Sequence, residues 1–123
     1  MKRKVHVVPH SHWDREWYFT TSRSKVYLMK DFKDVLDTLE TKKEFRYFML
    51  DAQGSLLDDY IKWMPADKER IKKLVKEKRL IIGPWYTQSD QLVISGESIV
   101  RNMYYGMKCC EEYGGYMNIG YVP

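Results

Sequence analysis

Apolar residues recur along the chain at helical spacing in several stretches, and these stretches predict amphipathic helices. The first runs from Ser24 to about Thr41, with its apolar positions at Leu28, Phe32, Val35, Leu36 and Leu39. A second stripe predicts a helix after Ser95, a suitable N-cap, that stops at Gly114–Gly115. This stripe consists of Ile99, Val100, Met103, Tyr104 and Met107. Two shorter helices are predicted over residues 56–61 and after Pro65.

Short runs rich in β-branched and aromatic residues predict four strands between these helices. They cover residues 4–9, 46–51, 80–83 and 118–122, and the first is typical of a buried strand. Strands that alternate with helices favour a parallel sheet with helical crossovers, so the predicted fold class is α/β. In such sheets the ligand site lies at the carboxyl ends of the strands. Polar and aromatic residues follow three of the strands, at 10–14, 51–53 and 85–90.

Length and composition are those of one globular domain, with 123 residues, 44% hydrophobic and 31% charged. The net charge of +4 comes from basic residues scattered over predicted helices, which we interpret as solvated faces and not as a nucleic-acid surface. No apolar run approaches the roughly 20 residues that span a bilayer, and none resembles a signal peptide. We therefore expect a cytoplasmic protein without membrane contact. Adjacent Cys109 and Cys110 are expected to be reduced, partly buried helix residues.

Alternating polar residues directly after the first predicted strand are the strongest chemical signal. His10, His12 and Asp14 would share one side of an extended segment, and imidazole with carboxylate suits zinc. The same string fits ordinary polar loop residues equally well. Asp51, at the end of the second predicted strand, would either face this site or serve only as a helix N-cap.

The residues around this string resemble a known family. Residues 8–17 (VPHSHWDREW) are similar to the opening zinc motif of glycoside hydrolase family 38 α-mannosidases. The resemblance implies that His12 and Asp14 are metal ligands and that Trp17 lines the sugar pocket; the other interpretation of Trp17 is a core aromatic residue.

A second motif supports the same family. Residues 82–90 (IGPWYTQSD) resemble the segment that leads to the catalytic aspartate of these enzymes, which implies that Asp90 is the nucleophile and also contacts the zinc. Residues 119–123 resemble a later family strand, so the likeness covers the whole chain. It is nearest to the bacterial branch that includes mannosylglycerate hydrolase.

The resemblance also implies an architecture and an activity. Residues 1–123 would form the amino-terminal portion of a parallel β/α barrel-like catalytic domain that acts on α-mannosides with one Zn²⁺ and a retaining mechanism. The family's acid/base carboxylate and remaining zinc histidine would lie beyond Pro123. We therefore expect the rest of the domain downstream, an inactive chain when alone, and a tendency to form homo-oligomers through uncovered apolar faces.

Several alternatives stay open on the sequence alone. His10 is as suited to orienting a ligand as to binding metal, and Trp85 would either shape the site or pack beneath it. Other zinc-dependent hydrolases, such as deacetylases, also use a His-x-Asp motif on α/β barrels. A non-enzymatic module that binds sugar or nucleic acid is the third interpretation.

Overall fold

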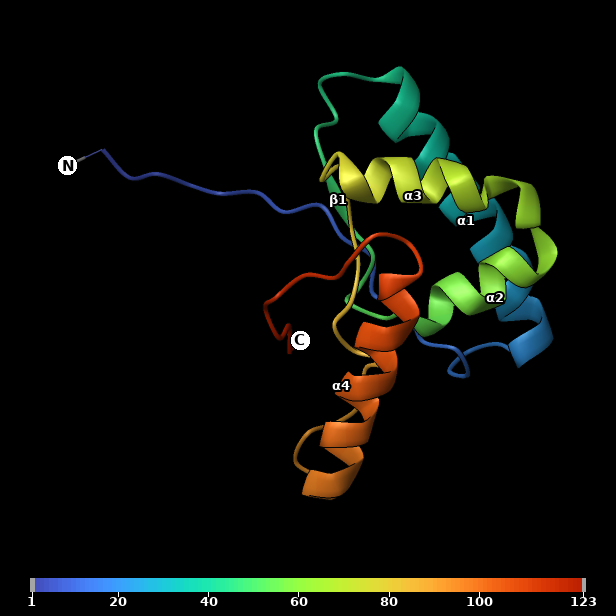
Figure 1. Ribbon diagram of the computed structural model, residues 1–123, viewed down its shortest axis with the longest axis vertical. Helices are drawn as coiled ribbons and strands as arrows, with labels where there is room; N and C mark the ends of the chain where they lie inside the picture. Colours follow the sequence, from blue (N-terminus) through green and yellow to red (C-terminus); the bar gives the residue numbers. More distant parts are fainter. Residues whose placement is uncertain (1, 123) are drawn as a thin grey trace.

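A computed structural model describes residues 2–122, and helices alternate with two of the four predicted strands (Figure 1). In chain order these are α1 (Thr21–Thr41), β1 (Phe48–Met49), α2 (Ser55–Trp63), the 3-10 helix η1 (Pro65–Asp67), α3 (Lys68–Lys76), β2 (Leu80–Ile81) and α4 (Gly96–Glu111). Among the described residues, no helix combines the length and apolar character needed to cross a membrane.

The two strands are short and parallel, and α2, η1 and α3 form the crossover between them. Phe48 pairs with Leu80, and Met49 with Ile81. On the other edge of β1, Met49 N donates to Pro9 O (3.0 Å) and Ser11 N donates to Met49 O (3.3 Å). The predicted parallel α/β arrangement is thus confirmed on a small scale.

The predicted buried strand at residues 4–9 is wrong. Residues 2–8 extend away from the rest of the molecule (Figure 1), and the Val5 side chain is 81% exposed. A strand needs a neighbour for its backbone groups, and β1 offers one only to residues 9–11. Apart from the bond from the Tyr47 hydroxyl to Val7 O (2.7 Å), residues 2–8 make no hydrogen bond within the described chain.

The predicted fourth strand at residues 118–122 is also wrong, because this segment is irregular. Two isolated hydrogen bonds, and no β-ladder, connect residues 117–121 to the residues that follow β2. Met117 N donates to Ile82 O (2.8 Å), and the Trp85 indole donates to Tyr121 O (2.8 Å). The other two strands are shorter than predicted, since pairing extends over only two residues of each.

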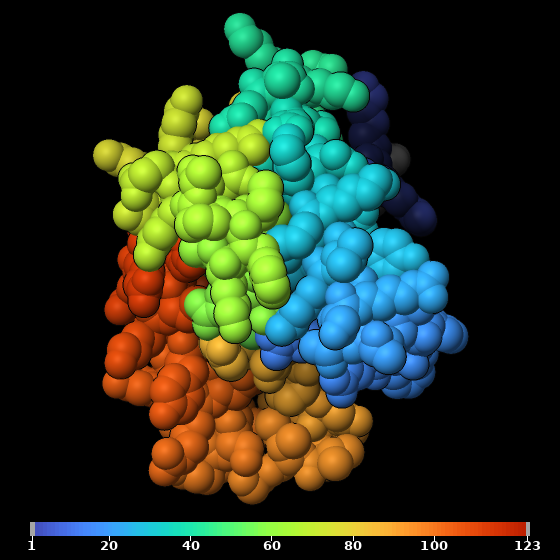
Figure 2. Space-filling view, turned by 90° about the vertical axis from the view of Figure 1, so that its right-hand side faces the viewer, coloured from blue at the N-terminus to red at the C-terminus, as the bar shows by residue number. Residues whose placement is uncertain are grey.

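The core lies where α1, α2 and α3 pack against the strands. The view in Figure 2 shows these helices side by side, with α4 below them. The predicted stripe of α1 is buried, at Leu28, Phe32, Leu36 and Leu39. α2 contributes Leu56, Leu57 and Tyr60, and α3 contributes Ile71 and Leu74. Apolar periodicity therefore located the main core correctly in these three helices.

Helix α4 begins as predicted after Ser95 and ends at Glu111, a few residues before the predicted stop at Gly114–Gly115, and it buries a different face. Ser95 caps it as predicted, with its hydroxyl accepting from Ser98 N at 3.2 Å. Its first turns project beyond the other helices (Figure 1), and the predicted stripe there is largely exposed, with Val100 at 58% and Tyr104 at 61%. The buried residues of α4 are Gly106 and Cys110. α4 has glycine at position 106 because the chain after β2, at Pro84 and Trp85, comes too close to leave room for a larger side chain.

Candidate active site

A cleft of about 310 Å³ lies between the loop after Ser11 and the first half of α1. Three residues singled out by the first motif, His12, Asp14 and Trp17, line it together. The remaining lining residues are Trp13, Tyr18, Phe19, Ser24, Tyr27 and Asp31. Trp17 is 71% exposed, which excludes a core role for it within the described chain. The cleft is therefore walled by aromatic rings and carries the candidate ligands on one side.

His12 lies between two carboxylates, each facing a different ring nitrogen. Its Nε2 is 3.6 Å from Asp14 Oδ1, and its Nδ1 is 3.7 Å from Asp51 Oδ1. Asp51 is fully buried, and its Oδ1 has no hydrogen-bond partner among the described residues. A buried carboxylate oxygen without a partner is costly, which makes this atom a candidate acceptor for the imidazole.

Asp51 also fixes the backbone of the first motif. Its Oδ2 accepts from Trp13 N (3.0 Å) and from the Gln53 side-chain amide (2.6 Å), and the same amide donates to Trp13 O (3.1 Å). The side chain does not cap α2, whose N-cap position is Gly54. Of the two interpretations left open for Asp51, the structure therefore supports the one in which it faces the candidate site.

The second motif reaches the same aspartate from the other side. The Gln88 side-chain amide donates to Asp51 O (2.9 Å), so both motifs meet at this residue. Asp90, two residues further on, is exposed, and its Oδ1 accepts from Leu92 N (3.0 Å). It is not among the residues that line the cleft. The structure thus brings His12, Asp14 and Asp51 together but leaves Asp90 outside this group.

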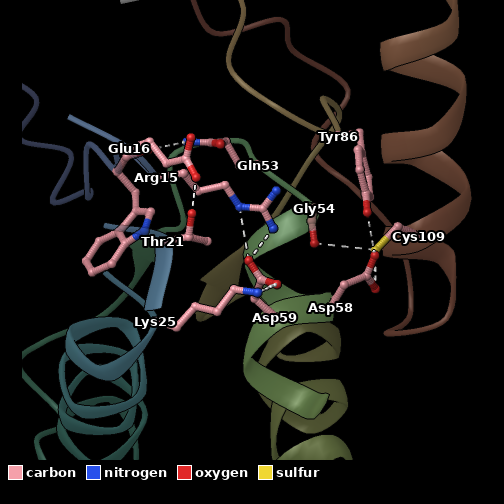
Figure 3. Close-up of polar contacts among 11 residues, drawn as sticks. Arg15, Glu16, Thr21, Lys25, Gln53, Gly54, Asp58, Asp59, Tyr86 and Cys109 are labelled. Atoms are coloured by element: carbon pink, nitrogen blue, oxygen red, sulfur yellow. Dashed lines mark hydrogen bonds and ion pairs between the residues drawn. The ribbon is translucent and has the colours of Figure 1, made fainter. Parts of the chain in front are cut away.

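Tyr86 anchors the second motif to α2 (Figure 3). Its hydroxyl donates to Asp58 Oδ2 (3.0 Å), and the Cys109 thiol of α4 approaches Asp58 Oδ1 at 3.4 Å. Burial, followed by the neighbouring Asp58 carboxylate, raises the pKa of Tyr86. The same two causes raise the pKa of the Cys109 thiol. Both groups are therefore protonated near neutral pH and act as hydrogen-bond donors.

His10 and Trp85 lie apart from the cleft. His10 Nδ1 lies 2.7 Å from Ser11 O, and its ring meets Tyr121 edge to face at a centroid distance of 5.5 Å. Trp85 is buried, and its indole holds the C-terminal segment through Tyr121 O. Within the described residues, Trp85 thus packs against the C-terminal segment and does not line the cleft.

The cluster around His12 fits part of a zinc site. Two ligand atoms bound to tetrahedral zinc at about 2.0–2.1 Å lie roughly 3.3 Å apart. The 3.6 Å between His12 Nε2 and Asp14 Oδ1 is close to this spacing. A metal-binding histidine usually donates its other N–H to a carboxylate, which is where Asp51 lies. Across residues 2–122, however, no three His, Cys, Asp or Glu side chains are arranged to hold a metal ion.

Sequence reasoning missed the side chains that hold the motifs in place. Arg15 and Gln88 belong to the motifs themselves, but their hydrogen-bond partners are distant in the sequence. Arg15 donates to Asp59, 44 positions away, and Gln88 donates to Asp51, 37 positions away. The cleft residues Tyr27 and Asp31 lie one turn apart on α1, a spacing that could have marked them as neighbours. The consecutive carboxylates Asp58 and Asp59 on a predicted helix could likewise have been recognised as candidate hydrogen-bond acceptors for the motifs.

Comparison with known proteins gives consistent matches along the whole chain. Residues 2–123 match the glycosyl hydrolases family 38 N-terminal domain. A provisionally named mannosylglycerate hydrolase of Halalkalibacterium halodurans is 40% identical over 124 residues, covering 100% of this chain and 14% of that protein. Alpha-mannosidase 2 of Arabidopsis thaliana is 33% identical over 94 residues, covering 73% of this chain and 8% of that protein.

Solved structures match the fold as well. An alpha-mannosidase from Enterococcus faecalis V583 superimposes with a TM-score of 0.89 at 43% identity, over 94% of this chain and 13% of that one. A protein in the glycosyl hydrolase family 38 from Enterococcus faecalis superimposes with a TM-score of 0.82 at 39% identity, over 93% of this chain and 13% of that one. The chain spans about one seventh of the length of the Halalkalibacterium halodurans relative.

Proposed function

Because the chain belongs to glycosyl hydrolase family 38, we propose that it forms the amino-terminal part of the catalytic domain of a retaining, zinc-dependent α-mannosidase. The observation that carries the proposal is the meeting of both family motifs at buried Asp51, next to an aromatic cleft. In the complete domain, the segments at residues 9–11, β1 and β2 would be consecutive strands of a barrel-like parallel sheet. Figure 1 is consistent with this, since α1, α2 and α3 all lie on one side of β1.

The substrate class follows from the cleft and from the relatives. Exposed Trp17 offers an apolar ring face to the C–H groups of a sugar, and polar groups of His12 and Asp14 lie on the same cleft. One relative is named for mannosylglycerate and others for α-mannosides. The proposed substrate is an α-mannoside whose aglycone is another sugar or a small anion such as glycerate.

Asp90 is the proposed nucleophile. Its carboxylate would attack the anomeric carbon while the bond to the leaving oxygen breaks, and a second carboxyl from elsewhere in the domain would protonate that oxygen. Water then releases the mannose from Asp90 with retention of configuration. The loop that carries Asp90 is held by α4, where the Asn102 side chain accepts from Thr87 N (2.8 Å) and donates to Thr87 O (2.7 Å).

His12, Asp14 and Asp90 are the proposed metal ligands in this chain. Zinc, when bound, would supply a positive charge that holds vicinal sugar hydroxyls. Asp51 would accept the Nδ1 proton of His12, which leaves Nε2 free to bind the metal and fixes the ring. Asp51 is therefore proposed as an orienting residue and not as a ligand.

The test uses this chain and a version extended to the length of its relatives. The extended protein should bind one zinc ion and hydrolyse an aryl α-mannoside with retention of configuration, whereas the chain alone should be inactive. Asp90→Ala should lower kcat by several orders of magnitude, since no other group can form the glycosyl-enzyme. His12→Ala and Asp14→Ala should lower both zinc content and activity.

Two exposed residues provide matched controls, His6 for His12 and Asp34 for Asp14. His6→Ala and Asp34→Ala should leave zinc content and rate unchanged. Zinc binding with hydrolysis of acetyl esters or amides, but not of α-mannosides, would contradict the glycosidase assignment and favour another metal hydrolase. Chelator-insensitive, salt-dependent binding to nucleic acid, without zinc, would contradict the enzyme assignment altogether.

A further inference from the structure

Two consecutive carboxylates on α2, Asp58 and Asp59, face different neighbours and together contact both family motifs (Figure 3). We propose that Asp58 and Asp59 are positioning residues that hold the two motif loops in register with each other. The inference deepens the proposed function, because the loops they hold carry the proposed metal ligands and nucleophile. Neither aspartate lines the cleft, so each would act through another residue.

Asp59 holds the first motif through a cluster of opposite charges. Its Oδ2 accepts from Arg15 Nε (3.0 Å) and also from Arg15 Nη2, while its Oδ1 pairs with Lys25 Nζ of α1 (3.3 Å). The Asp59 side chain is only 12% exposed, so these contacts are partly shielded from water and salt. The cluster joins the loop, α1 and α2 at one point.

This cluster restricts the segment that carries Asp14. Trp13 is tied to Asp51 and Gln53 through its backbone, and Arg15 is tied to Asp59 through its side chain. Asp14 therefore lies between two tethered neighbours. A further contact, from the Thr21 hydroxyl to the Glu16 carboxylate, fixes the next residue to the start of α1 (Figure 3). A ligand-bearing loop held at successive residues is preorganised for metal binding.

Asp58 holds the second motif together with the start of α2. Besides the bond from the Tyr86 hydroxyl, Gly54 N donates to Trp85 O (2.8 Å) and Ser55 N donates to Tyr86 O (2.9 Å). The second motif thus has backbone anchors in addition to the side-chain anchor at Asp58. Loss of Asp58 should disturb the site less than loss of Asp59, because Asp58 accepts from the neutral Tyr86 hydroxyl, whereas Asp59 pairs with two cations.

The experiment measures zinc affinity by competition with a chromophoric chelator in the full-length protein, along with kcat and KM. Asp59→Asn and Arg15→Met should each weaken zinc binding by about 10- to 100-fold, the usual effect of removing a residue that supports a metal ligand. Asp58→Asn should weaken it less than about 10-fold. Arg15→Lys keeps one charged donor and should recover part of the affinity.

Asp37→Asn is the matched control, because Asp37 on α1 also accepts from two cations, Lys33 and Arg70, but contacts neither motif. It should lower the thermal midpoint less than Asp59→Asn does, because the Asp37 side chain is 44% exposed, and it should leave zinc affinity and KM unchanged. If Asp59→Asn changes only the thermal midpoint, as Asp37→Asn does, Asp59 has a merely structural role and the inference is overturned.

A second measurement separates this inference from the proposed function. Fluorine NMR of protein labelled with 5-fluorotryptophan reports Trp17 directly, and the metal-free protein suffices. In Arg15→Met and Asp59→Asn the Trp17 signal should shift or broaden, whereas the signal of buried Trp85 should stay. An unchanged Trp17 signal in both variants would overturn the inference whether or not the protein binds zinc. Absence of zinc binding in the unaltered protein would count against the proposed function alone.

Discussion

Helices α1 and α4 both carry apolar stripes in the sequence, yet only α1 buries its stripe. Leu36 of α1 is fully buried, whereas Val100 of α4 is 58% exposed. α1 packs against α2 and has buried residues from Ser24 to Leu39, while the buried residues of α4, Gly106 and Cys110, both lie in its second half. An apolar stripe thus indicates a helix, but a neighbour decides whether the stripe is buried.

The two helices also contribute differently to the candidate site. α1 supplies a wall of the cleft through Tyr27 and Asp31. α4 contributes no lining residue, but Asn102 and Gly106 hold the loop that carries the proposed nucleophile. α1 therefore forms part of the cleft, whereas α4 supports the loop that carries the proposed nucleophile.

The largest expected effect tests the buried stripe of α1. Leu36→Ala removes a fully buried side chain and leaves a cavity, which should lower the free energy of unfolding by about 2–5 kcal/mol. Val100→Ala on α4 should change it by less than about 0.5 kcal/mol, because that side chain is already largely solvated. Urea unfolding followed by circular dichroism measures both. Equal losses would mean that α4 buries its stripe as well.

The next effect tests the face that α4 does bury. A Cβ at Gly106 would lie 2.2 Å from both Pro84 O and Trp85 C, so Gly106→Ala must displace the backbone after β2. We expect a loss of about 1–3 kcal/mol in the free energy of unfolding. Gly96→Ala, with no atom within 4 Å of its Cβ, is the matched control and should not destabilise. A neutral Gly106→Ala would show that α4 packs less closely than described.

The last expected effect is a dependence of stability on pH, and it concerns the thiol on the same face. Burial raises the pKa of Cys110 from about 9 to about 12, so the folded protein holds this proton more tightly than the unfolded chain does. The stabilising contribution is complete below about pH 9 and is lost as the pH rises towards 12. The free energy of unfolding should fall by about 1 kcal/mol per pH unit in this window. Cys110→Ala should show a shallower fall, and an identical slope would contradict burial of the thiol.

Much of the candidate site was accessible from the sequence, because its first motif is local. His12, Asp14 and Trp17 lie within six residues, so a short loop keeps them close together, and α1 supplies the other wall of the cleft. Asp51 was recognisable only as a carboxylate at a strand end. Its role depends on His12 and Trp13 of the first motif and on Gln88 of the second, two segments that lie far apart along the chain.

The order of the α-helices, the parallel pairing of β1 with β2 and the membership of the family could be predicted from the amino-acid sequence. These follow from local periodicity, capping residues and contiguous motifs. The exposure of residues 2–8, the packing of α4 through Gly106 and the different motifs that Asp58 and Asp59 face became visible only in the folded chain. Strand pairing, burial and ion pairing each require a partner that lies far away along the chain, and periodicity carries no information about that partner.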